Sequence, residues 1–93
     1  MAKLKSLENK VVWITGASSG LGKALARECA LQGAQVVLTS RRYDELESVR
    51  VGLLKPEQHL SIAADITDES QVRHAYEQVL ACKGRIDWLI NNA

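Results

Sequence analysis

The fold is decided by the stretch Val11-Val12-Trp13-Ile14-Thr15-Gly16-Ala17-Ser18-Ser19-Gly20-Leu21-Gly22. Its first five residues are apolar or β-branched without alternation, which predicts a strand covered on both faces, as in a parallel sheet. A glycine-rich loop follows, and a helical period begins near Leu21. This order of elements predicts an anion site, because the first N–H groups of a helix are unpaired and its dipole favours negative charge.

The same alternation of strand and helix continues along the chain. We predict strands over 35–40, 60–64 and 87–91, and helices over 21–32, 43–54 and 69–83. Pro56 is expected to stop the second helix, and Gly33 the first. The resulting βαβαβαβ order has no long linkers or repeats. It predicts a single α/β unit with a parallel sheet and right-handed crossovers.

The spacing of apolar residues predicts which side of each helix faces the sheet. The inner positions would be Leu21, Ala24, Leu25, Glu28 and Cys29 in the first helix, Leu46, Val49 and Leu53 in the second, and Val72, Ala75, Val79 and Cys82 in the third. Both cysteines stand alone within helical patterns, without a C-x-x-C motif. We therefore expect free buried thiols in a reducing compartment.

Composition excludes several classes of protein. The chain has 93 residues, 46% of them hydrophobic, and a net charge of +1, which fits one globular domain and leaves no basic excess to hold a nucleic acid. Its apolar runs are only about four residues long, far short of a membrane span of about 20 residues. The first residues lack the apolar core of a secretory signal. His59 and His74 have no ligand-spaced partners, so no metal site is expected. The unpaired cysteines and the missing signal together predict a cytoplasmic location.

The glycine loop has three readings besides dinucleotide binding. A phosphate-binding Walker loop would need Gly at 17 and Ser or Thr at 24, and the sequence has Ala17 and Ala24. The segment 16–20 matches G-x-S-x-G, which would make Ser18 a hydrolase nucleophile, although neither histidine falls where sheet topology puts a triad histidine. A tight turn without a ligand is the third reading.

The next strand ends at Ser40, 18 residues after Gly22, where a dinucleotide-binding unit contacts the ribose. Ser40 is followed by Arg41 and Arg42 rather than by an acid. An acid would accept from the ribose hydroxyls and repel a 2′-phosphate, whereas an arginine fork matches phosphate oxygens. The sequence therefore predicts NADP(H) as cofactor, with a solvated arginine pair at a helix start as the alternative.

Three motifs together resemble the short-chain dehydrogenase/reductase family. Residues 15–22 match its T-G-x-x-x-G-x-G cofactor loop, Asp65 matches the acid that closes its third strand, and residues 91–93 match the start of its N-N-A-G motif. The resemblance covers the chain from about Leu7. It implies a doubly wound Rossmann-type sheet with strand order 3-2-1-4 over residues 1–93.

The family resemblance also implies roles for residues of this chain. The cofactor loop would hold the pyrophosphate and ribose, Arg41 with Ser40 and Arg42 the 2′-phosphate, Asp65 the adenine amino group and Ile66 the ring, while Asn92 would brace neighbouring strands. The implied cofactor-binding set is Gly16, Ser18, Ser19, Gly20, Leu21, Gly22, Ser40, Arg41, Arg42, Asp65, Ile66, Asn91, Asn92 and Ala93. Asp65 as a mere loop acid, and Asn91 and Asn92 as plain turn residues, remain alternatives.

The implied activity is hydride transfer between NADP(H) and a small carbonyl or alcohol substrate, in a homo-oligomer. The family's catalytic Tyr-x-x-x-Lys is absent, because Tyr43 and Tyr76 are followed four residues later by Glu47 and Leu80. No catalytic residue is predicted here. We expect the chain to be the N-terminal cofactor half of a longer enzyme, or a non-catalytic dinucleotide-binding module. When isolated, it is expected to self-associate through its last strand or to fold poorly.

Overall fold

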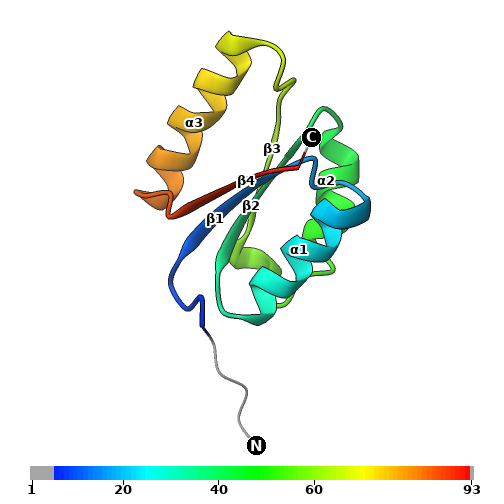
Figure 1. Ribbon diagram of the computed structural model, residues 1–93, viewed down its shortest axis with the longest axis vertical. Helices are drawn as coiled ribbons and strands as arrows, with labels where there is room; N and C mark the ends of the chain where they lie inside the picture. Colours follow the sequence, from blue (N-terminus) through cyan, green and yellow to red (C-terminus); the bar gives the residue numbers. More distant parts are fainter. Residues whose placement is uncertain (1–5, 93) are drawn as a thin grey trace, which may run out of the picture.

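The computed structural model describes residues 6–92 as a four-stranded parallel sheet with helices on both faces (Figure 1). In chain order the elements are β1 Val11–Thr15, α1 Gly20–Leu31, β2 Gln35–Ser40, α2 Tyr43–Arg50, a short 3-10 helix Pro56–Gln58, β3 Leu60–Ala63, α3 Glu69–Lys83 and β4 Trp88–Asn91. The strand order is β3-β2-β1-β4. This confirms the predicted doubly wound α/β fold.

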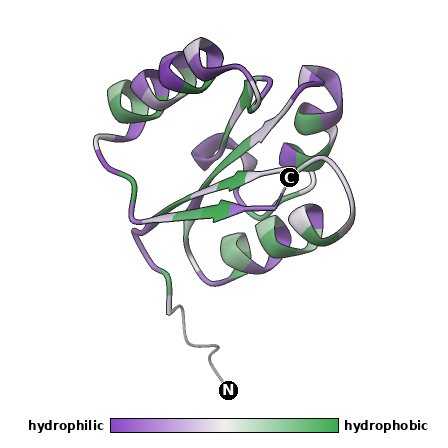
Figure 2. Ribbon diagram, turned by 45° about the horizontal axis from the view of Figure 1, so that its top comes forward, coloured by the Kyte–Doolittle hydropathy of each residue, from purple (hydrophilic) through white to green (hydrophobic). Residues whose placement is uncertain are grey.

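The two faces of the sheet have separate hydrophobic cores. Helices α1 and α2 cover one face and α3 covers the other (Figure 1). The residues of β1 alternate between them, so that Val12 and Ile14 belong to the first core and Val11 and Trp13 to the second. This explains the continuous apolar run, because a strand covered on both faces needs no polar positions. In Figure 2 the central strands are mostly coloured hydrophobic, while the helices around them alternate between hydrophilic and hydrophobic residues.

The predicted inner side of α1 is wrong for most of its positions. Its buried residues are Gly22, Ala26, Cys29 and Ala30, whereas Leu21 is 65% exposed. Ala24 and Glu28 are also exposed, and Leu25 is half-buried. The helix presents its smallest side chains to the sheet, which allows a close approach of the two backbones. The position of the leucines is therefore a poor guide to the packed side of this helix.

The other two helices follow the predicted pattern more closely, although α2 is shorter than predicted. Leu46, Val49 and Leu53 are all buried, but α2 ends at Arg50 rather than Leu54 because the N–H groups of Gly52 and Leu53 bond back to carbonyls only three residues earlier. In α3, Ala75 and Val79 are buried and Val72 is half-buried.

Cys82 is exposed, contrary to the prediction, and Cys29 is buried as expected. None of the helices within residues 6–92 is both long and apolar enough to span a membrane. The same residues hold no group of three metal-binding side chains.

The loop between β1 and α1 folds tightly against the first turn of the helix. A Cβ atom on Gly22 would lie 2.1 Å from the carbonyl oxygen of Gly16 and 2.8 Å from Nδ2 of Asn92. Gly20 is different, because its φ is +57° but no atom lies within 4 Å of an added Cβ. Gly22 is required because there is no room for a side chain, and Gly20 is favoured because its backbone is in the left-handed region.

We predict that Gly22→Ala destabilises the protein by about 3 kcal/mol or more, because the methyl group meets backbone that cannot move without displacing the loop. Gly20→Ala serves as the matched control and is expected to cost about 1–2 kcal/mol through its left-handed φ alone. Chemical denaturation of both variants measures the difference. Equal destabilisation by the two substitutions would contradict the close approach.

His59 links the start of β2 to the turn after α2, at the edge of the sheet opposite the glycine loop. Only 6% of the residue is exposed, its Nδ1 accepts from the N–H of Val36 at 3.0 Å, and its Nε2 lies 2.8 Å from the carbonyl oxygen of Leu54. The first bond requires an unprotonated Nδ1, so the ring is neutral and Nε2–H donates to Leu54. Burial is the main cause that lowers the pKa of His59 below its usual value.

We predict that the free energy of unfolding falls by about 0.5–1 kcal/mol between pH 7.5 and pH 5.5. The pKa of His59 is lower in the folded state, so the unfolded chain takes up the proton first and stability is lost as the pH drops below about 6.5. His59→Asn should flatten this dependence, while His74→Asn, at an exposed position of α3, should leave it unchanged. Denaturation series at both pH values compare the variants, and an unchanged slope in His59→Asn would refute the assignment.

Candidate functional site

The carboxyl ends of the parallel strands meet at one edge of the sheet and surround an open pocket of about 880 Å³. Crevices at this edge are where open α/β sheets bind ligands. Many of the predicted site residues line the pocket, together with three that were not predicted. The complete lining is Gly16, Ser18, Ser40, Arg41, Arg42, Glu45, Ala64, Asp65, Ile66 and Thr67.

The start of α1 carries the features of an anion site. Ser19 is the N-cap residue, yet its side chain makes no capping hydrogen bond, and the first turn holds no acidic residue. The loop before it is fixed to the next strand, because the N–H of Ala17 donates to the carbonyl of Thr39 at 3.2 Å. Ser19, Gly20 and Leu21 are exposed. No side chain therefore competes with an anion for this helix end.

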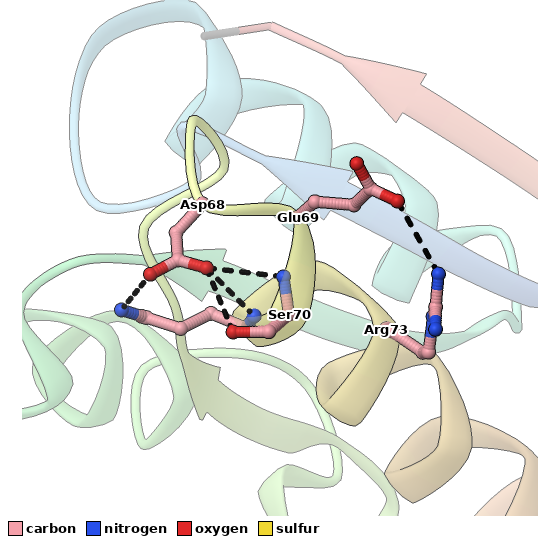
Figure 3. A network of polar contacts seen from close by, with 5 residues as sticks. Asp68, Glu69, Ser70 and Arg73 are labelled. Atoms are coloured by element: carbon pink, nitrogen blue, oxygen red, sulfur yellow. Dashed lines mark hydrogen bonds and ion pairs between the residues drawn. The ribbon is translucent and has the colours of Figure 1, made fainter.

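The N-terminus of α3, which lies at the same edge of the sheet, differs from that of α1 because a side chain caps it. Asp68 caps it, since its Oδ1 accepts from the backbone N–H and the hydroxyl of Ser70 at 3.0 and 2.8 Å (Figure 3). Glu69 adds a second negative charge and pairs with Arg73 across one turn. This helix end is thus satisfied by its own residues. Of the two helix ends, α1 is the one open to an anionic ligand.

Two arginines supply positive charge on the β2 side of the pocket. Arg41 and Arg42 are exposed, and the N–H of Arg42 donates to Oγ of Ser40 at 3.3 Å. The guanidinium of Arg42 lies 3.7 Å from Glu45, whereas Arg41 has no ion-pair partner among residues 6–92. Sequence reasoning missed Glu45 as a pocket residue. Its signal was an acid in the first turn of a helix that opens with arginines.

The β3 side of the pocket supplies a carboxylate held by its own loop. Oδ1 of Asp65 accepts from the N–H of Thr67 at 2.9 Å and from its hydroxyl at 2.7 Å. The Thr67 hydroxyl is the main cause that lowers the pKa of Asp65, and the charge of Arg41 lowers it further. The carboxylate is therefore ionised near neutral pH and can only accept hydrogen bonds. Thr67 was also missed, although an acid followed two residues later by threonine is a turn signal.

The end of β4 is tied to the end of β1 through Thr15. The Thr15 hydroxyl donates to Oδ1 of Asn91 at 3.0 Å and accepts from the N–H of Asn92 at 3.1 Å. Nδ2 of Asn92 donates to the carbonyl oxygen of Gly16 at 3.2 Å. Asn92 thus braces the glycine loop, and Thr15 is a further residue whose part in the site went unpredicted.

The predicted residues do not all meet in one cavity. Asn91 lines a second, smaller hollow of about 180 Å³ on the α3 face, which shares Ala64 and Ile66 with the larger pocket. Gly22 is buried beneath the loop. Ser19, Gly20 and Leu21 lie beside the pocket wall rather than in it. Ala93 lies outside the described residues.

The structure gives no support to Ser18 as a hydrolase nucleophile. Ser18 lies at the carboxyl end of β1, while His59 is bonded to Val36 at the opposite end of the sheet. His74 is on α3, beside Ile62 and Ala63 of β3. Neither histidine is positioned as the base that such a nucleophile requires.

Solved structures with this fold confirm the architecture. A short chain dehydrogenase from Bacillus anthracis is 40% identical with a TM-score of 0.89, covering 95% of this chain and 36% of that one. A 3-ketoacyl-(acyl-carrier-protein) reductase from Brucella melitensis, solved with NADH, is also 40% identical with a TM-score of 0.84, over 90% of this chain and 34% of that one.

Curated relatives point the same way. A dehydrogenase/reductase SDR family protein 7-like from Anopheles gambiae is 45% identical over 95% of this chain, and dehydrogenase/reductase SDR family member 7 from Homo sapiens is 43% identical over 92%. The chain spans 30% and 27% of these two relatives' lengths. The family described as short chain dehydrogenase matches residues 10–93. The chain therefore belongs to the short chain dehydrogenase family of oxidoreductases.

Proposed function

We propose that this chain is the dinucleotide-binding part of an NADP(H)-dependent oxidoreductase that acts on a small carbonyl or alcohol. When bound, the nicotinamide cofactor would supply a hydride to a carbonyl or accept one from an alcohol. The residues of this chain bind and orient the cofactor. The observation that carries the proposal is a pocket lined by two arginines and an accepting carboxylate, next to the uncapped start of α1 at the same edge of the sheet.

The parts of the pocket match the parts of a dinucleotide. The α1 start suits the pyrophosphate, because backbone N–H groups and the helix dipole both favour negative charge there. Asp65 suits an amino group, because an ionised carboxylate accepts from it. The parallel sheet orders these two features along its edge, with the ends of β2 and β3 on the same side of the glycine loop.

The choice of NADP(H) over NAD(H) rests on the end of β2. A neutral Ser40 stands where an acid would repel a 2′-phosphate, and Arg41 follows without an ion-pair partner in residues 6–92. An unpaired guanidinium at the wall of an open pocket is a ready partner for phosphate oxygens. The Brucella melitensis reductase was solved with NADH, which supports binding of a nicotinamide dinucleotide. The preference for NADP(H) is inferred from the residues of the present chain alone.

Fluorescence titration of the protein with NADPH and with NADH tests the proposal directly. We expect binding of both, with NADPH bound about tenfold or more tightly because of the additional charge-assisted bonds to its 2′-phosphate. Raising the salt concentration should weaken NADPH more than NADH, since ion pairs at exposed arginines are screened. Absence of binding to either dinucleotide would overturn the proposed function, and a preference for NADH would overturn the NADP(H) assignment.

Arg41→Asp is predicted to weaken NADPH binding about 10- to 100-fold, because the substitution removes one phosphate partner and adds a like charge. NADH affinity should change by about threefold or less, since NADH lacks the phosphate that Arg41 would hold. Arg27→Asp carries the same change of charge on the exposed side of α1, outside the pocket lining, and should leave the ratio of the two affinities unchanged. A NADPH-to-NADH affinity ratio unaltered by Arg41→Asp would refute the assignment of Arg41.

A further inference from the structure

We propose that Thr67 is a positioning residue that fixes the Asp65 carboxylate so that one of its oxygens discriminates the amino group of a purine base from an oxo group. The inference rests on the proposed function, since the base is that of the dinucleotide. It adds a residue that no motif of the sequence singled out. Asp65 would touch the base, and Thr67 would act only through Asp65.

Thr67 holds one oxygen of the carboxylate with two donors. Its backbone N–H lies 2.9 Å and its hydroxyl 2.7 Å from Oδ1 of Asp65. Neither residue is buried, so packing does not fix the Asp65 rotamer. An exposed carboxylate that must take one orientation loses rotamer entropy on binding a ligand, and prior hydrogen bonds reduce this loss. The two bonds from Thr67 are thus what orders the side chain.

The other carboxylate oxygen is left for a ligand. Oδ2 of Asp65 has no hydrogen-bond partner among residues 6–92. Both Asp65 and Thr67 line the pocket, and the charge of Arg41 acts on Asp65 across it. The carboxylate is an acceptor without a proton to give, so an amino group at this position is attracted and a carbonyl oxygen is repelled.

The backbone of Asp65 is anchored independently of Thr67. The N–H of Asp65 donates to Oε1 of Gln71 at 2.9 Å, and its carbonyl accepts from the N–H of Asp68 at 3.0 Å. The side chain of Gln71 also donates to Oδ2 of Asp68 at 3.2 Å, within the capping network of α3 (Figure 3). Loss of the Thr67 hydroxyl should therefore release the Asp65 side chain while the main chain stays in place.

The test compares NADPH with its 6-oxo analogue, in which hypoxanthine replaces adenine, in equilibrium titrations of the whole protein. Thr67→Val keeps the shape and the backbone N–H but removes the hydroxyl, and Thr67→Ser keeps the hydroxyl. The unmodified protein should prefer NADPH about tenfold or more, because the oxo group faces a carboxylate. Thr67→Val should lose about three- to tenfold of this preference, and Thr67→Ser should keep it within about twofold.

Each result separates the inference from the function on which it rests. Binding of neither ligand by the unmodified protein would overturn the proposed function as well. Equal binding of the two ligands would overturn the base-reading role of Asp65 while leaving dinucleotide binding intact. If Thr67→Val weakens both ligands by the same factor, Thr67 is merely structural and the inference is wrong. Thermal unfolding of the variants checks that all of them are folded.

Discussion

The close approach of Gly22 to the carbonyl oxygen of Gly16 is the constraint on which the rest of the site depends. A side chain at this position would push the loop off the helix, because even a Cβ would lie 2.1 Å from that oxygen. With glycine there, a loop of four residues is enough to join the end of β1 to α1, whose open N-terminus lies at the edge where β2, β3 and β4 also end. The amide of Asn92 then bonds the same carbonyl and joins β4 to the loop.

The order of strands places the ends of β2 and β3 beside the glycine loop, and the pocket between them has positive and negative charge at different strand ends. Positive charge gathers at the end of β2, where Arg41 has no ion-pair partner in the described chain, and negative charge stands at the end of β3, where Thr67 holds Asp65. The N-terminus of α1 lies on the β1 side of both. A dinucleotide has phosphates at its centre and a base at each end, so a pocket that combines cationic and accepting groups suits it better than a uniformly basic one would.

The sequence predicted the strands to within one residue because each is a short, largely apolar run, which is a local property; only β1 and β2 are buried along most of their length, whereas β4 is largely exposed. The packed side of α1 was wrong because it depends on how closely the helix meets the sheet, and there Ala26 and Ala30 fit where Leu21 does not. Motifs found the glycine loop and the acid after β3. Glu45 and Thr67 were missed because their parts in the site are an ion pair and hydrogen bonds to groups that a motif does not specify. Thr15 belongs to the matched loop motif, but its bonds to Asn91 and Asn92 could not be predicted from that motif.

The two edges of the sheet have different roles, because the polar groups of one edge stabilise the fold and those of the other are open to a ligand. At the edge where the strands begin, polar groups satisfy one another: Asp87 accepts from the N–H of Val11 at 2.8 Å, His59 from that of Val36, and Lys83 donates to the carbonyl of Gln58 at 2.7 Å. At the edge where the strands end, the α1 start has no side-chain cap and one oxygen of Asp65 is unbonded within residues 6–92. Polar groups left without protein partners cost stability unless water or a ligand satisfies them. The groups at the second edge are open to solvent, so water can satisfy them in the free protein and a ligand can replace that water, which is what a binding site requires.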